Sequence, residues 1–265
     1  MEIRPKPPIE DREFIDNFLE FGIGHYYRIC QILVHNFEKM TDSERRSAAL
    51  EIHAAASSTL ELVITWFYAL REWHSASGQA YLVDVLHSTE LSPSKRKGAL
   101  RQVRKSSLKG FCDPLGIECT NKDLIPQGID PSGRRAEIKL VIEAITQIFG
   151  QTDPVVPEAR PDWMMDCLNT IKHGLVLTHS EYEGSPSVKL LTSGSQPVGK
   201  DGLPAIYEVR ATPEAINTLV EIAGNGSIAL GGLIRLVYLS KYKSNPISSV
   251  VSSITDDLYG SSPGV

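Results

Sequence analysis

The apolar residues of the N-terminal part of the chain recur mainly at the three- and four-residue steps of an α-helix. This spacing predicts a helix over residues 11–40, weakened locally at Gly22 and Gly24. The apolar residues that define its expected buried face are Phe14, Phe18, Phe21, Ile29, Leu33 and Phe37.

A second, longer helix is expected from residue 42 to about Trp73, because this stretch contains neither proline nor glycine. Thr41 followed by Glu44 fits the capping box, in which a hydroxyl and a carboxylate satisfy two otherwise unpaired amides. Its expected apolar face consists of Leu50, Ala54, Leu60, Ile64, Phe67 and Leu70. Two long helices so close together favour a helical bundle.

The spacing changes from helical to alternating after Gly174 and returns to helical after Arg210. The strands are expected over 175–180, 187–192 and 205–210, with a turn over 193–204. Further helices are expected over 81–87, 134–149, 162–173, from Thr212-Pro213-Glu214 onward, and over 227–243, with a long loop over 111–133. The predicted fold is mainly α: a helical bundle with a small antiparallel β-sheet or hairpin insertion near residues 175–210.

We expect a flexible N-terminal arm over residues 1–10, a single helical domain over 11–243, and a flexible tail over 244–265. The four cysteines are few and scattered, which favours free thiols in a reducing compartment. The apolar run 227–239 contains Arg235 and is too short to span a bilayer. With no apolar signal region at the N-terminus, these features predict a cytoplasmic protein without a membrane segment.

A strongly basic segment interrupts a chain whose net charge is -5. Between Ser92 and Cys112 there are seven basic residues and no acidic one. They are Lys95, Arg96, Lys97, Arg101, Arg104, Lys105 and Lys109. Such a cluster can neutralise nucleic-acid phosphates, or it can be a solvated helix that balances an acidic neighbour or partner. Both interpretations remain open.

The most distinctive short run is Asp166-Cys167-Leu168-Asn169-Thr170-Ile171-Lys172-His173-Gly174. Asp166, Asn169 and His173 lie three and four residues apart, so they share one helical face. The other side is apolar, and Gly174 suits the left-handed position after a helix. His173 would lie in the last turn, where the helix dipole favours its protonated form.

This run resembles the motif of HEPN domains (higher eukaryotes and prokaryotes nucleotide-binding), Arg-x4–6-His with a polar residue after the arginine. Asn169 and His173 match the polar and histidine positions, but Leu168 stands where the family has arginine. The resemblance implies a helical bundle, a homodimer, RNA as partner and a metal-independent ribonuclease site in many members. A chain without the arginine is expected to resemble the degenerate members of this family, which serve as binding or partner modules.

A second polar stripe, His53, Ser57, Glu61 and Thr65, follows the long helix at four-residue spacing. If it faced His173, a glutamate could orient the histidine and Arg28 could replace the missing arginine in space. The alternative is a solvated face or a satisfied network between helices.

No paired metal-ligand spacing, glycine-rich phosphate loop or nucleophile elbow is visible, so no metal or cofactor is expected. The leading hypothesis is a HEPN-like, nucleic-acid-associated binding or assembly module in bacterial defence that forms homo-oligomers or binds a protein partner. One alternative is a ribonuclease that uses His173, Asn169, Lys172 and Arg28. Another is a purely structural interaction subunit.

Overall fold

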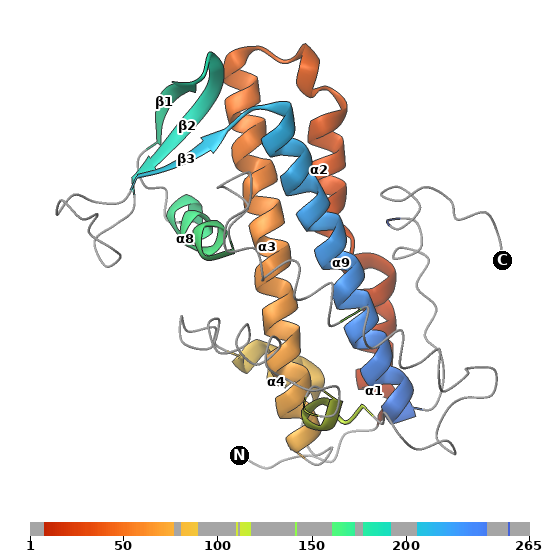
Figure 1. Cartoon of the computed structure of the whole chain (residues 1–265). Coiled ribbons are helices and arrows are strands. Elements are labelled where there is room, and N and C mark those ends of the chain that lie inside the picture. Colours follow the sequence, from red (N-terminus) through yellow and green to blue (C-terminus); the bar gives the residue numbers. More distant parts are fainter. Residues whose placement is uncertain are drawn as a thin grey trace. The chain divides into compact units, whose positions relative to one another are not determined.

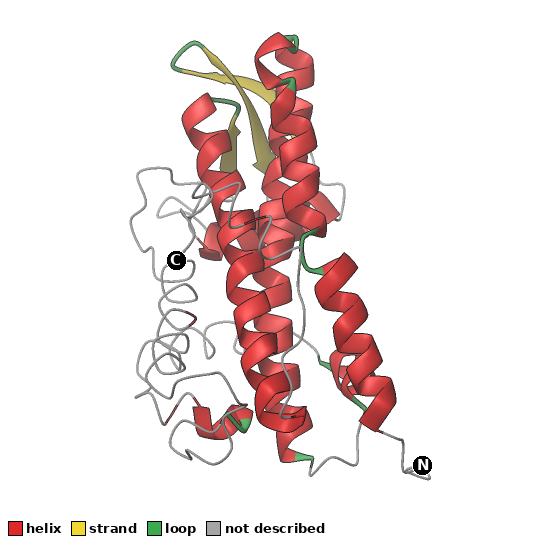
Figure 2. Cartoon of the chain, turned by 90° about the vertical axis from the view of Figure 1, so that its right-hand side faces the viewer, coloured by secondary structure: helices red, strands yellow, loops and turns green. Residues whose placement is uncertain are grey.

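In the computed structural model the chain is mostly helical, with one small antiparallel sheet (Figures 1 and 2). The predicted fold class, mainly α with helical-bundle character and a small sheet, is confirmed. The structure describes residues 8–76, 81–89, 110, 112–117, 141, 161–172, 177–191, 206–242 and 254.

The chain divides into two compact units. Unit 1 comprises residues 1–24, 62–150 and 225–265, and unit 2 comprises residues 25–61 and 151–224. Two long helices, α3 (Asp42–Ser75) and α9 (Pro213–Tyr242), each contribute residues to both units. The expected helices from Thr212 and over 227–243 are one continuous helix, because the small residues near Gly224 and Gly226 are buried in it.

The N-terminal region folds as four short elements instead of the single helix expected over 11–40. These are α1 (Pro8–Asn17), the π-helical turn η1 (Phe18–Gly22), α2 (His25–His35) and the 3-10 turn η2 (Phe37–Lys39). The break falls at the two glycines. The buried row also differs from the expected one. Its members are Ile15, Leu19, Ile23, Tyr27 and Cys30, and Phe37 is the one expected residue that is buried. Phe21, on the expected face, is 65% exposed.

Unit 1 is tied together around Trp73 of α3. The Asp11 carboxylate, 7% exposed, accepts hydrogen bonds from Trp73 Nε1 at 3.2 Å and from the backbone N–H of Leu82 at 2.8 Å. Lys241 Nζ lies 3.2 Å from the centroid of the Trp73 ring. Through these contacts one buried carboxylate and one indole join α1, α3, α9 and the short helix α4 (Leu82–Ser88), which was predicted at 81–87.

In unit 2, strands β1 (Leu177–Tyr182), β2 (Ser185–Leu191) and β3 (Ile206–Arg210) pair antiparallel in the order β1-β2-β3. The predicted small antiparallel sheet is thus confirmed. Glu183 and Gly184 both have positive φ, which suits the two-residue hairpin turn between β1 and β2. One face carries the buried residues Val188, Leu190, Tyr207 and Val209. Helix α8 (Pro161–Lys172) contacts β2 (Figure 1).

Helices α3 and α9 begin with the caps that the sequence predicts. Thr41 N–H and Oγ1 donate to Glu44 Oε2 at 2.7 and 2.8 Å, and Thr41 Oγ1 accepts from the Glu44 amide at 3.4 Å. These bonds lower the pKa of Glu44. At the start of α9, Thr212 Oγ1 accepts from the Ala215 amide at 3.2 Å.

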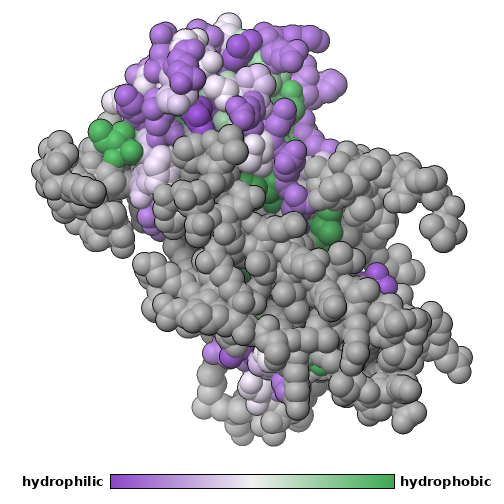
Figure 3. Space-filling model, in the orientation of Figure 1, coloured by the Kyte–Doolittle hydropathy of each residue, from purple (hydrophilic) through white to green (hydrophobic). Residues whose placement is uncertain are grey.

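Within the described residues, one helical stretch, Pro213–Tyr238, is long and apolar enough to cross a membrane by length and composition. Its most apolar window is 67% buried inside the protein, as in the core helix of a soluble protein. The run expected to be too short is therefore part of a longer helix. The described surface visible in Figure 3 is largely hydrophilic. Over all described residues, the large exposed apolar side chains are Phe21, Ile32, Val83 and Ile206.

Candidate functional site

The distinctive run lies on α8, which begins at Pro161. The apolar side is packed inward as expected, and its buried members are Met164, Met165, Cys167 and Leu168. Asp166 and Asn169 are half-buried on the other side, and Lys172 is exposed. His173 and Gly174 lie outside the described residues.

Leu168, at the position of the family's arginine, is only 3% exposed. A guanidinium acting on a phosphate must reach the surface or a cleft, whereas this side chain belongs to the core of unit 2. Burial of an apolar side chain of this size stabilises the fold by about 1.5–3 kcal/mol. Leucine therefore serves packing here.

The second polar stripe meets the end of α8 at one point. Lys172 Nζ lies 2.7 Å from Glu61 Oε2, with side-chain exposures of 50% and 24%. An ion pair this exposed contributes at most about 1 kcal/mol to stability. The pair nevertheless places a carboxylate of α3 beside the residue that precedes His173.

The earlier members of this stripe, His53 and Ser57, are both 0% exposed. His53 Nδ1 and Ser57 Oγ lie 3.4 Å apart, and the tautomer of the ring decides which of them donates. Neither side chain reaches solvent, and both belong to α3, so this polar contact lies within one helix. The two sequence-based alternatives for the rest of the stripe stay predictions.

Asp166 connects α8 with the sheet. Its Oδ2 accepts a hydrogen bond from Tyr207 Oη at 3.0 Å, and the Trp163 ring meets the Tyr207 ring edge-on at a centroid distance of 4.8 Å. The Asp166 carboxylate is therefore a structural acceptor that anchors α8 to β3. No pattern within the local sequence pointed to Tyr207, because the contact joins segments distant along the chain.

A second polar cluster links α3 with the sheet. Arg46 Nε and Nη2 donate to the carbonyl oxygens of Ser187 and Ser180 at 3.2 and 3.3 Å. The hydroxyls of the same two serines donate to Glu208 Oε1 at 2.7 and 2.8 Å. Their donors and acceptors are matched, as in a structural network. Sequence reasoning missed this cluster as well.

The other predicted site residues are dispersed or undescribed. Arg28 is exposed on α2. Because His173 lies outside the described residues, the expected approach of Arg28 to His173 stays a prediction. The seven basic residues of the predicted phosphate-binding segment lie outside the described residues. They are Lys95, Arg96, Lys97, Arg101, Arg104, Lys105 and Lys109.

The cysteines differ from the expectation of four free thiols. Cys30 and Cys167 are free and buried, but Cys112 is disulfide-bonded. Burial raises the pKa of the Cys30 thiol to about 12, so this thiol is inert at neutral pH. Among the described residues, no three His, Cys, Asp or Glu side chains are grouped to hold a metal ion.

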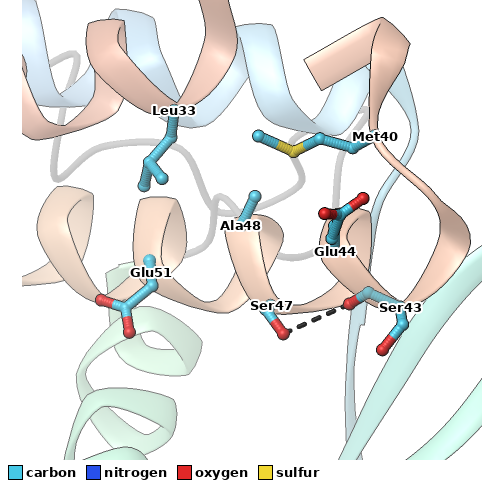
Figure 4. Close-up of a pocket in the computed structure, with 7 residues that line it drawn as sticks. All are labelled: Leu33, Met40, Ser43, Glu44, Ser47, Ala48 and Glu51. Carbon is cyan, nitrogen blue, oxygen red and sulfur yellow. Dashed lines mark hydrogen bonds between the residues drawn. The ribbon is translucent and has the colours of Figure 1, made fainter. Parts of the chain in front are cut away.

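An open groove of about 270 Å³ lies in unit 2 (Figure 4). Its apolar part is formed by Leu33 of α2, Met40 of the connection before α3, and Ala48 of α3, and the remaining lining is polar. The polar lining residues are Ser43, Glu44, Ser47 and Glu51. No residue of the groove belongs to the polar stripe of α8.

Comparisons with protein-family models, curated protein sequences and solved structures give no match for this chain. The residues and their geometry are therefore the basis for a functional proposal.

Proposed function

We propose that this chain is a HEPN-like helical module that binds RNA or another nucleic acid without cleaving it, and that it self-associates. The burial of Leu168 carries the proposal, because the side chain at the family's arginine position is 3% exposed and packs in a core. The half-buried Asn169 and the Glu61–Lys172 ion pair leave a polar helix end suited to positioning rather than to phosphate activation.

Nucleic-acid binding is assigned to the segment between Ser92 and Cys112. The net charge of -5 means that attraction to phosphates must be local, and this segment holds seven basic residues and no acidic one. Each phosphate contact releases counterions, so binding through it should weaken steeply with salt.

The test is the salt dependence of RNA affinity in two matched variants. Lys97→Gln/Lys105→Gln removes two charges from the segment, and Lys39→Gln/Lys189→Gln removes two charges from exposed positions elsewhere. The first pair should lower the slope of log affinity against log salt by about 1.4 for single-stranded RNA, and the second should leave it unchanged. Equal slopes for both pairs, or no RNA binding by the wild type, would contradict the proposal.

A ribonuclease remains the second candidate because Glu61 and Lys172 form an ion pair next to His173 in sequence. In that case His173 would act as general base or acid, aided by Asn169, Lys172 and Arg28, within hydrogen-bond reach of a ribose hydroxyl or leaving oxygen. Purified protein would be incubated with mixed RNAs and chelator, beside His173→Ala. His179→Ala, which removes an exposed histidine of β1, is the matched control. Cleavage lost only in His173→Ala would establish the enzyme over the binding module.

A further inference from the structure

The groove of unit 2 has an apolar centre built from three consecutive segments of the chain. Leu33 belongs to α2 and Met40 to the connection before α3, and both side chains lie over Ala48 of α3 (Figure 4). Ala48 presents only a methyl group, which leaves the space of about 270 Å³ open above the helix. This space is large enough to admit a side chain from another molecule.

Two carboxylates flank this centre on one face of α3. Glu44, Ala48 and Glu51 are spaced four and three residues apart, so their backbones follow one side of α3. Glu44 is turned toward Met40, and Glu51 lines the other end of the groove with its side chain extending away from Leu33 (Figure 4). At a rise of about 1.5 Å per residue, the two glutamates are about 10 Å apart along the axis. Hydrogen bonds from Thr41 lower the pKa of Glu44 and keep that carboxylate ionised. Glu51 is exposed and makes no ion pair with any residue in the described part of the chain.

The nearest arginines in sequence do not neutralise these two glutamates. Arg45 Nη2 donates to the carbonyl oxygen of Glu38 at 2.8 Å. Arg46 donates to the carbonyls of Ser187 and Ser180 in the sheet. Both guanidinium groups are thus engaged with backbone oxygens, and the groove keeps an apolar centre between two negative ends.

We propose that this groove docks a cationic amphipathic helix of a partner protein. The complementary surface is an apolar side chain between two basic side chains about two helical turns apart. The apolar side chain would displace water from Leu33, Met40 and Ala48, while the basic groups lie opposite Glu44 and Glu51. Laying the apolar face of a helix into a groove is a common mode of peptide recognition. This proposal is independent of RNA binding.

The probe is a fluorescein-labelled helical peptide of about four turns, with two lysines seven residues apart and two leucines between them. A second peptide carries glutamates in place of the lysines. Fluorescence polarisation should detect binding of the lysine peptide only. Glu51→Lys should weaken it about tenfold, because an attraction becomes a repulsion, and Met40→Ala should weaken it by removing apolar contact. Glu181→Lys changes an exposed glutamate of β1 and should have no effect.

Circular dichroism and thermal melting would establish that each variant is folded. Unchanged affinity in Glu51→Lys, or an equal loss in Glu181→Lys, would overturn the proposal. A loss in Glu51→Lys without any loss in Met40→Ala would also overturn it, because binding would then depend on charge alone. Complete displacement of the peptide by spermidine, a polyamine without an apolar side chain, would have the same meaning.

Discussion

Restoring the arginine of the HEPN motif with Leu168→Arg should damage the fold instead of creating an active site. Leu168 is 3% exposed and lies among other buried residues of α8. Loss of a buried leucine costs about 2–5 kcal/mol when the space is left empty. Arginine fills the space, but burying its charge without a partner costs several kcal/mol more. This cost is smaller if the long side chain allows the guanidinium to reach water. We therefore expect a loss of at least about 3 kcal/mol in the free energy of unfolding.

Urea unfolding followed by circular dichroism measures this loss, with Leu168→Met as the matched control. Methionine conserves volume and hydrophobicity, so its cost should stay below about 1.5 kcal/mol. Both variants would also be incubated with RNA and chelator. A Leu168→Arg protein that unfolds at the wild-type urea concentration and gains RNA cleavage would refute the reasoning, because position 168 would then face a functional cleft.

Three further predictions concern local packing and titration. Gly232→Ala should destabilise unit 1, because the added Cβ would lie 2.6 Å from Val141 Cγ2, and Val141→Ala should relieve most of that loss in a double-mutant cycle. Glu44 has a lowered pKa in the folded protein, so its ionised form stabilises the fold above its unfolded pKa and loses this contribution as pH falls through the folded pKa. The stability advantage of the wild type over Glu44→Gln should therefore disappear in acid unfolding experiments, and an advantage that persists at low pH would show that charge is not the cause. The Cys30 thiol should not react with a thiol reagent in native protein at neutral pH and should react after denaturation, since burial raises its pKa to about 12; rapid native labelling would contradict this.

The local features of the fold were predictable because each depends on a few neighbouring residues. Thr41 and Glu44 form a capping box by their own spacing, and Thr212 caps α9 in the same way. The alternation after Gly174 predicted the strands, and the burial of the apolar side of α8 followed from its helical period.

The choice between two apolar rows could not be made from the sequence of residues 11–40. Phe14, Phe18 and Phe21 have helical spacing, and so do Ile15 and Leu19. Tertiary packing selected the second row, which is 1% exposed at both of these positions. The continuity of α9 through its glycines has the same origin, since burial of its flanks outweighs their low helix propensity.

The site was less predictable than the fold because its contacts join distant segments. Glu61 and Lys172 are 111 residues apart, and Asp166 and Tyr207 are 41 apart. A stripe on one helix indicates which side chains share a face, but its partner comes from the tertiary fold. The groove beside Ala48 likewise depends on the approach of α2 to α3.

The most direct test of the central claim is RNA binding without RNA cleavage by the full chain. Radiolabelled RNA would be followed in the presence of chelator by both gel shift and denaturing gel, across a salt series. We expect a shifted, intact RNA for the wild type, and a much weaker shift for Lys97→Gln/Arg101→Gln/Arg104→Gln/Lys105→Gln. Two results would contradict binding without cleavage. The first is RNA that the wild type cleaves and His173→Ala leaves intact, and the second is an unchanged gel shift for the fourfold variant.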